Sequence, residues 1–145
     1  MKGLDTNVLL RFLTADEPKQ SRIPRRLIED AETMGDRLHL STLVLVELVW
    51  VLRGRRYSLS RSEIADLLDE LLNTVVFEVQ DRDLVRRATS AFRADAADFS
   101  DYLIGEIDRR AGCEATLTFD RRLARTSGFE EPRGEDGSPP RVSEP

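Results

Sequence analysis

The chain has 145 residues, a length that suits one domain with a single hydrophobic core rather than two. Hydrophobic residues make up 40% and charged residues 34%, and no apolar run approaches the roughly 18 residues that cross a bilayer, which excludes a membrane protein. The net charge of −5 argues against a strongly basic nucleic-acid-binding protein, although five of the acids lie in residues 130–145.

The ends of the chain and its cysteine content indicate a compartment. The N-terminus has no hydrophobic signal segment, and the acid at position 5 argues against export. The single cysteine, Cys113, excludes an internal disulfide and fits a reducing cytosol. It also excludes a multi-cysteine zinc site, since only His39 could assist it. The sequence therefore predicts a cytoplasmic protein.

Short apolar segments alternate with helical patterns along residues 1–129. Strands are predicted over residues 2–4, 37–40, 74–79 and 115–119. Helices are predicted over residues 8–13, 16–34, 41–53, 60–72, 81–93 and 98–107, with a short basic helix from 120 to 125. This alternation predicts an α/β fold, a three-layer sandwich whose mainly parallel central sheet is flanked by helices.

Local signals mark the helix starts and the end of the domain. Ser41 is predicted to cap one helix, and Ser60 with Glu63 is predicted to form a capping box on the next. After Phe129 the chain becomes acidic and rich in proline and glycine, and such a segment cannot bury enough apolar surface to order itself. We therefore expect one domain over residues 1–129 and a disordered tail over residues 130–145.

Two aspartates directly follow predicted strands. Asp5 comes after the first strand and Asp120 after the last. Functional groups in open α/β folds gather at the carboxyl ends of strands, which makes these two acids a site hypothesis. The alternative for each is that it only caps the helix that follows.

Glu47 interrupts a helix that is apolar on nearly every face. Such a helix is expected to be buried almost all round, and an unpaired carboxylate there would cost several kcal/mol. A functional role is one explanation. The alternatives are a pairing with a core arginine or a position that faces solvent.

Asp98 and Asp101 lie three residues apart and share a face of the helix that they begin. In the simplest assignment, Asp98 caps the helix and the side chain of Asp101 points into a site as a ligand. The alternative is that both only cap and solvate the helix.

Four carboxylates in one place imply a cation. Each pair at about 4 Å would repel by roughly 4 kcal/mol at an effective dielectric near 20, so the cluster needs a positive ion to stay charged. Carboxylates without histidine or thiolate neighbours select Mg²⁺ or Mn²⁺, and His39 is expected to be structural. The chemistry expected is metal activation of water and an in-line displacement at phosphorus. One histidine cannot build a catalytic triad, and no glycine-rich phosphate loop occurs.

The order and spacing of these motifs resemble the PIN-domain nucleases, and most closely the VapC toxins of bacterial toxin–antitoxin pairs. The motifs are Asp5-Thr6-Asn7, Glu47 in its apolar helix, Asp98-Phe-Ser-Asp101, and Thr-Phe-Asp120. The resemblance implies an endoribonuclease that depends on Mg²⁺ or Mn²⁺, in which Asp5, Glu47, Asp101 and Asp120 are the catalytic and metal-binding acids. It implies supporting roles for the polar neighbours Thr6 and Asn7, while Thr118 and Asp98 lie where outer hydrogen bonds would be useful.

The resemblance also implies partners. These nucleases usually form homodimers, and a small antitoxin is expected against the helix pair 6–13 and 17–34. The substrate is RNA, which arginines near the acids would grip through phosphates. The candidate residues, which are otherwise solvated or paired with surface acids, are Arg53, Arg55, Arg56, Arg121, Arg122 and Arg125.

Three other functions compete. A PIN nuclease without an antitoxin could process RNA or cleave DNA, and a degenerate PIN fold could act only as a nucleic-acid-binding module, although all four acids are present. A phosphotransfer domain also begins with an aspartate after a first strand. Here no second aspartate follows two residues after Asp5, and no lysine occurs after Lys19, which argues against that function.

Overall fold

The structure is a computed structural model that describes residues 1–14 and 18–138. Its strands are all parallel and lie in two sheets, one ordered β1 (Lys2–Gly3), β2 (Leu38–Leu40), β3 (Phe77–Val79), the other made of β4 (Thr116–Leu117) and β5 (Phe129–Glu130). The helices are α1 (Thr6–Thr14), α2 (Pro18–Met34), α3 (Thr42–Arg53), α4 (Arg61–Asn73), α5 (Arg82–Ala94), α6 (Phe99–Arg110) and the 3₁₀ helix η1 (Leu123–Arg125). The prediction of an α/β fold with parallel strands is confirmed.

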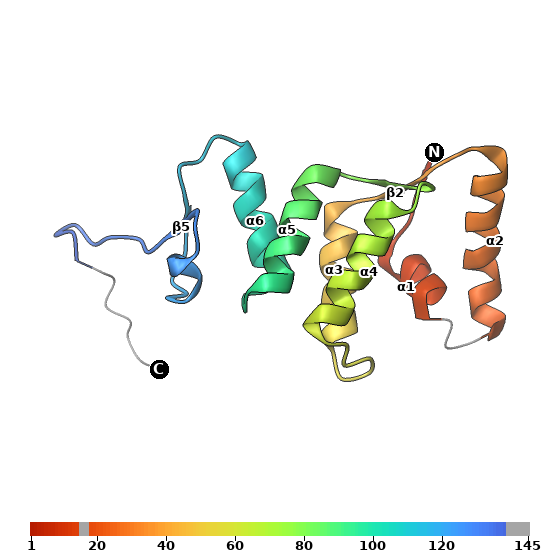
Figure 1. Cartoon of the computed structure of the whole chain (residues 1–145), viewed down its shortest axis with the longest axis horizontal. Helices are drawn as coiled ribbons and strands as arrows, with labels where there is room; N and C mark the ends of the chain where they lie inside the picture. Colours follow the sequence, from red (N-terminus) through yellow and green to blue (C-terminus); the bar gives the residue numbers. More distant parts are fainter. Residues whose placement is uncertain (15–17, 139–145) are drawn as a thin grey trace.

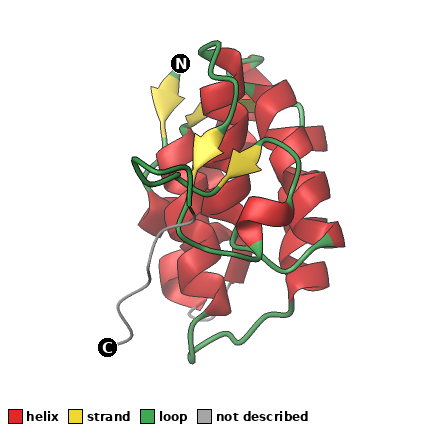
Figure 2. Ribbon diagram, turned by 90° about the vertical axis from the view of Figure 1, so that its left-hand side faces the viewer, coloured by secondary structure: helices red, strands yellow, loops and turns green. Residues whose placement is uncertain are grey.

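The helices stand side by side along the length of the molecule (Figure 1). Helix α2 lies at one end, α3 to α6 occupy the middle, and β5 lies beyond α6 at the other end. Helix α5 packs against both α4 and α6, and this packing leads the chain away from β1 before β4 begins. The parallel strands are therefore divided between two sheets rather than joined in one, and they are short beside the helices (Figure 2).

The core lies between the three-stranded sheet and the helices. Leu38 and Leu40 of β2 and Phe77 and Val79 of β3 point into it and are almost fully buried. The intervening residue His39 is half-buried on the other side of the strand, as the two-residue period of a strand requires. Within the described ranges, no helix is long and apolar enough to cross a membrane.

Both predicted caps are confirmed. The Ser41 hydroxyl accepts a hydrogen bond from the backbone N–H of Val44 at 3.2 Å. Ser60 accepts from the N–H of Glu63 at 3.2 Å, and the Glu63 carboxylate accepts from the N–H of Ser60 at 3.1 Å. These bonds satisfy backbone donors that have no partner inside the helix, so they fix where α3 and α4 begin.

Two boundaries differ from the sequence prediction. Strand β5 was not predicted, because two residues give no periodic signal and Glu130 had been assigned to the tail. The backbone N–H of Gly134 donates to the Ser138 carbonyl at 2.8 Å, closing a turn within the described part of that tail. The predicted helix start at residues 16–17 and the tail from residue 139 onward lie outside the described residues.

Candidate acidic site

Asp5 and Glu47 are linked through Thr6. The Asp5 carboxylate accepts a hydrogen bond at Oδ1 from the backbone N–H of Val8 at 3.0 Å, so Asp5 caps α1. The Thr6 hydroxyl donates to Oε2 of Glu47 at 2.8 Å. Thr6 thus ties the start of α1 to the middle of α3 and fixes one oxygen of Glu47, while the neighbouring Asn7 is exposed.

Glu47 lies on an exposed face of α3, so the expectation that this helix is buried almost all round was wrong. Leu43 is 65% exposed and Trp50 58%, and with Val51 they share the face of Glu47. The opposite face is buried through Leu45, Leu48, Val49 and Leu52. The helix is apolar on both faces, which is why hydrophobicity alone did not reveal the exposed one.

Asp98 stands at the N-cap of α6, as predicted, and Asp101 takes part in the same capping box. The Asp98 carboxylate forms an ion pair with Arg53 at the end of α3. The Asp101 carboxylate accepts the backbone N–H of Asp98 at Oδ2, at 3.1 Å, and so does part of the capping itself. Burial raises the pKa of Asp101 above its usual value, and the negative charges of Asp98 and Asp120 raise it further against the lowering effect of this hydrogen bond.

Asp120 caps the short helix η1. Its Oδ1 accepts the backbone N–H groups of Arg122 and Leu123 at 2.9 and 3.1 Å. Its own N–H donates to the Thr118 hydroxyl at 3.1 Å, which gives Thr118 a supporting contact. Because the charge of Asp120 acts on Asp101, these two carboxylates lie within electrostatic range of each other.

The four acids therefore form two pairs, with Asp5 and Glu47 in one and Asp101 and Asp120 in the other. In the described part of the chain, no three Asp, Glu, His or Cys residues come close enough to hold a metal ion together. The donor chemistry suits a hard divalent cation, since every ligand would be a carboxylate oxygen. The arrangement within one chain does not bring three of these carboxylates together among the described residues.

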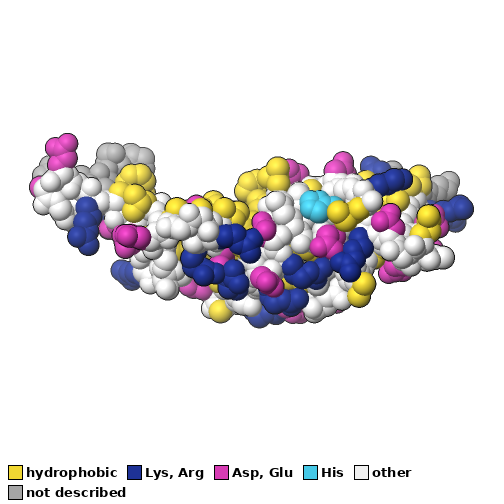
Figure 3. Space-filling model, turned by 90° about the horizontal axis from the view of Figure 1, so that it is seen from above, with side chains coloured by type: hydrophobic (Ala, Val, Ile, Leu, Met, Phe, Trp, Pro, Cys, Tyr) yellow, Lys and Arg dark blue, Asp and Glu magenta, His cyan; other side chains and the backbone are white. Residues whose placement is uncertain are grey.

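Three of the predicted RNA-binding arginines flank the second pair, and three lie at the end of α3. Arg121, Arg122 and Arg125 are exposed beside Asp120, as is Arg55 after α3. Arg53 is engaged with Asp98, and the guanidinium of Arg56 lies over the Tyr57 ring, 5.3 Å from its centroid. Basic and acidic side chains are interspersed over the face shown in Figure 3, so no single-sign patch marks an RNA path there.

Arg61 and the arginines of α5 and α6 make contacts that were not predicted from the sequence. Arg61 donates to three carbonyl oxygens of the α5–α6 segment at 2.7 to 2.9 Å. Arg87 and Arg109 both reach Glu106, and Arg110 pairs with Asp81. Only the spacing of Glu106 and Arg109 was visible in the sequence; the other contacts join distant segments.

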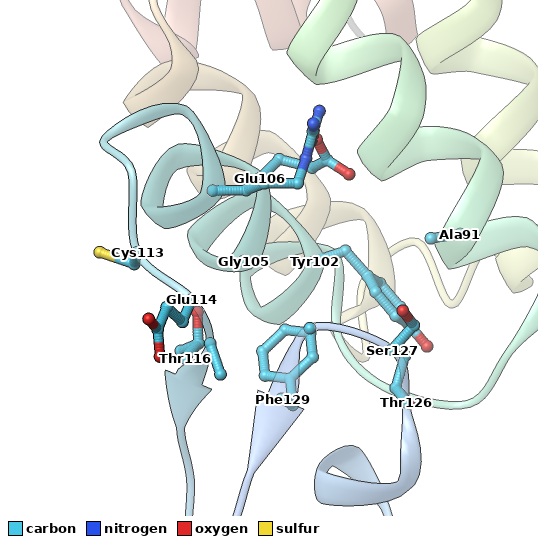
Figure 4. Close-up of a pocket in the computed structure, with 13 residues that line it drawn as sticks. Ala91, Tyr102, Gly105, Glu106, Cys113, Glu114, Thr116, Thr126, Ser127 and Phe129 are labelled. Carbon is cyan, nitrogen blue, oxygen red and sulfur yellow. Dashed lines mark hydrogen bonds and ion pairs between the residues drawn. The ribbon is translucent and has the colours of Figure 1, made fainter.

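A pocket of about 300 Å³ lies between α6 and the second sheet. The Phe129 ring reaches from β5 towards Gly105 of α6, beside Tyr102 (Figure 4). A Cβ atom built at Gly105 would lie 2.6 Å from the Phe129 ring, so the glycine permits this close contact. Of the four predicted acids, Asp120 lines a smaller cavity together with Asp95 and Arg122.

Comparisons with known proteins cover most of the chain. Residues 3–128 match the sequence profile of the PIN domain. A VapC ribonuclease from Aquifex aeolicus (strain VF5) is 30% identical over 123 residues, which cover 85% of this chain and 90% of that protein. Residues 3–128 contain all four acids described above.

Proposed function

This chain belongs to the PIN-domain family and is a relative of the VapC ribonucleases, and from that premise we propose that it is an endoribonuclease that hydrolyses RNA phosphodiester bonds as the toxin of a toxin–antitoxin pair. The observation that carries the proposal is the placement of its acids. Asp5, Asp101 and Asp120 each lie in the first turn or at the cap of a helix, and Glu47 lies on an exposed face held by Thr6.

The capping contacts position these carboxylates for ligand binding. One oxygen each of Asp5, Asp101 and Asp120 is held by backbone N–H groups, and one oxygen of Glu47 is held by the Thr6 hydroxyl. Fixing one oxygen limits the rotation of the carboxylate and leaves the other oxygen available as a ligand. We propose Mg²⁺ or Mn²⁺ as the cation, which requires the two pairs of acids to come together.

The proposed partners are RNA, a small antitoxin and a second copy of the chain, and the proposed location is the cytoplasm. Exposed arginines beside Asp120 support contact with phosphate groups. Ile23 is 77% exposed and Met34 81% on α2, where the antitoxin is expected. Large apolar side chains left exposed on a helix are typical of a surface that a partner covers.

One observation favours a second candidate, a PIN fold that binds nucleic acid without cleaving it. The described residues of a single chain do not gather three metal-binding side chains. The presence of all four acids supports the nuclease instead, because a module that only binds RNA would gain nothing from four negative charges among its phosphate contacts.

The test is an RNA cleavage assay with matched variants. The purified protein, freed of any bound partner, is incubated with total RNA with and without Mg²⁺ or Mn²⁺. We expect discrete fragments that require the cation and disappear with Asp5→Asn, while Asp66→Asn, an exposed acid on α4, leaves them unchanged. Absence of cleavage by the unmodified protein under either cation would support the binding module.

A further inference from the structure

The outer edge of β1 is open. Strand β1 is an edge strand of the first sheet, and among the described residues it pairs only with β2. The backbone N–H of Leu4 donates to the His39 carbonyl at 3.0 Å, so the alternation along a strand turns the N–H and C=O of Gly3 to the other side. An open edge of this kind is a template for another strand.

Strand β4 has an open edge of the same kind. The N–H groups of Thr116 and Thr118 donate to the Gly128 and Glu130 carbonyls at 2.8 and 2.9 Å. The backbone groups of Leu117 between them therefore point away from β5. Around this edge Leu117 is 64% exposed and Phe119 72%, so a strand with apolar side chains remains uncovered.

Pairing of these two edges would unite the acids. Asp5 lies two residues after Gly3, and Asp120 lies three residues after Leu117. If β4 joins β1 in parallel, as every described strand pairs, both aspartates emerge at the same end of adjacent strands, which lie about 4.8 Å apart. The pair Asp101 and Asp120 would then reach the pair Asp5 and Glu47.

Within one chain, the α5–α6 segment keeps β4 away from β1. Arg61 holds the carbonyls of Phe92, Ala96 and Ala97, and its guanidinium lies 4.3 Å from the centroid of the Phe92 ring. The N–H of Ala97 donates to the Tyr102 hydroxyl at 3.2 Å. Helices α5 and α6 stand between the second sheet and the first (Figure 1), and these contacts would break before β4 reached its own β1.

We propose that a second copy of this chain supplies β4 to the free edge of β1, so that each acidic site is made of Asp5 and Glu47 from one copy and Asp101 and Asp120 from the other. The inference rests on the proposed function, which assigns the four acids to one site. The exchange is reciprocal, so it closes as a two-fold dimer with two composite sites. It also covers apolar side chains near the acids that one chain leaves exposed, namely Leu43, Trp50, Ile104, Ile107, Leu117 and Phe119.

Mixed dimers test the composite site. Asp5→Asn and Asp120→Asn variants carrying different affinity tags are produced together, and the dimers that carry both tags are isolated. In such a dimer one site holds both substitutions and the other holds none, so we expect about half of the unmodified cleavage rate from two variants that are inactive alone. The matched control combines Asp5→Asn with Glu47→Gln, which damages both sites and is expected to stay inactive. Inactivity of the first mixture, with an active unmodified protein, overturns the proposal.

A second measurement does not depend on cleavage. Leu117→Pro removes the outward N–H of β4 and leaves the bonds from Thr116 and Thr118 to β5, whereas Leu117→Ala keeps that N–H. We expect light scattering to give the mass of a dimer for the unmodified protein and for Leu117→Ala, and that of a monomer for Leu117→Pro, with unchanged far-UV circular dichroism.

The single tryptophan reports the same event. Trp50 is expected to emit at shorter wavelength in the dimer than in Leu117→Pro, because the partner covers it. A dimer that survives Leu117→Pro, or an unmodified protein that is monomeric, overturns the exchange. If the unmodified protein cuts no RNA, these measurements still decide the exchange, and the proposed function fails separately.

Discussion

The two sheets of this protein differ in how much of their surface is buried. In the first, Leu38, Leu40 and Phe77 are nearly inaccessible to solvent, and helices cover the strands that carry them. In the second, β4 exposes Leu117, and only Phe129 of β5 is buried, against α6. Each region contains a capped helix start, with Ser41 at α3 in the first and Asp120 at η1 in the second. The difference shows that the first sheet is covered by helices, whereas the second sheet leaves the edge of β4 exposed to solvent.

The largest expected effect is a difference in RNA cleavage between variants of two acids at the start of α6, Asp101 and Asp98. Asp101→Asn is expected to reduce RNA cleavage by more than roughly 100-fold, because it removes a proposed ligand rather than an outer contact. Asp98→Asn is expected to retain most of the activity, since its carboxylate is engaged by Arg53. Single-turnover cleavage rates measure both. Equal losses of activity in the two variants would mean that Asp98 and Asp101 act only by capping the start of α6.

Core truncations compare the stability of the two regions. Leu48→Ala in α3 creates a cavity at a fully buried position, and we expect it to lower the free energy of unfolding by about 3 to 5 kcal/mol. Leu123→Ala in η1 is expected to cost about 2 kcal/mol, since the short helix has fewer neighbours and more freedom to collapse. Urea denaturation with a common slope measures both. A larger loss for Leu123 would show that the second region is the better packed one.

Much of the fold was predictable because local signals decide it. The caps of α3 and α4, the strand that precedes Asp5 and the helix that Asp98 begins all follow from residues close together in the sequence. The exposed face of α3 was not predictable, because Leu43 and Trp50 are as hydrophobic as the buried residues of the same helix. Periodicity shows which face is more apolar, and it gives no information when both faces are apolar.

The candidate site, like the fold, was predictable in part from the sequence. The identities of the four acids follow from the family motif, and the use of Asp5, Asp101 and Asp120 as helix caps follows from their positions. Their separation into two pairs depends on where α5 and α6 place β4, which is set by contacts between distant segments such as Arg61 with the carbonyl of Ala97. No spacing in the sequence encodes such a contact, so the order of the strands could not be derived from the motifs alone.

A smaller effect tests how the second sheet is anchored. Gly105→Ala places a methyl group 2.6 Å from the Phe129 ring, and overpacking of this kind is expected to cost about 1 to 3 kcal/mol. Combining it with Phe129→Leu should recover part of the loss, because the smaller side chain leaves room for the methyl group. Thermal unfolding followed by circular dichroism measures both variants. If the double variant is less stable than Gly105→Ala, Phe129 stabilises the protein by contacts other than this one.

The smallest effect sharpens the comparison between two helix starts of similar design. Glu63 at α4 and Asp101 at α6 each accept the backbone N–H of the residue three positions earlier. The backbone hydrogen bond from Ser60, and then the bond from its side chain, lower the pKa of Glu63 below its ordinary value of 4.5, whereas burial raises the pKa of Asp101. A lowered pKa in the folded state stabilises the protein above the pKa of the unfolded chain, and this contribution is lost as the pH falls through the folded value.

The unmodified protein should therefore exceed Glu63→Gln in stability at pH 7, and urea denaturation should show the difference shrinking as the pH falls below about 4.5. A difference that stays constant with pH would mean that the neutral hydrogen bond, rather than the charge of Glu63 at the helix start, stabilises α4.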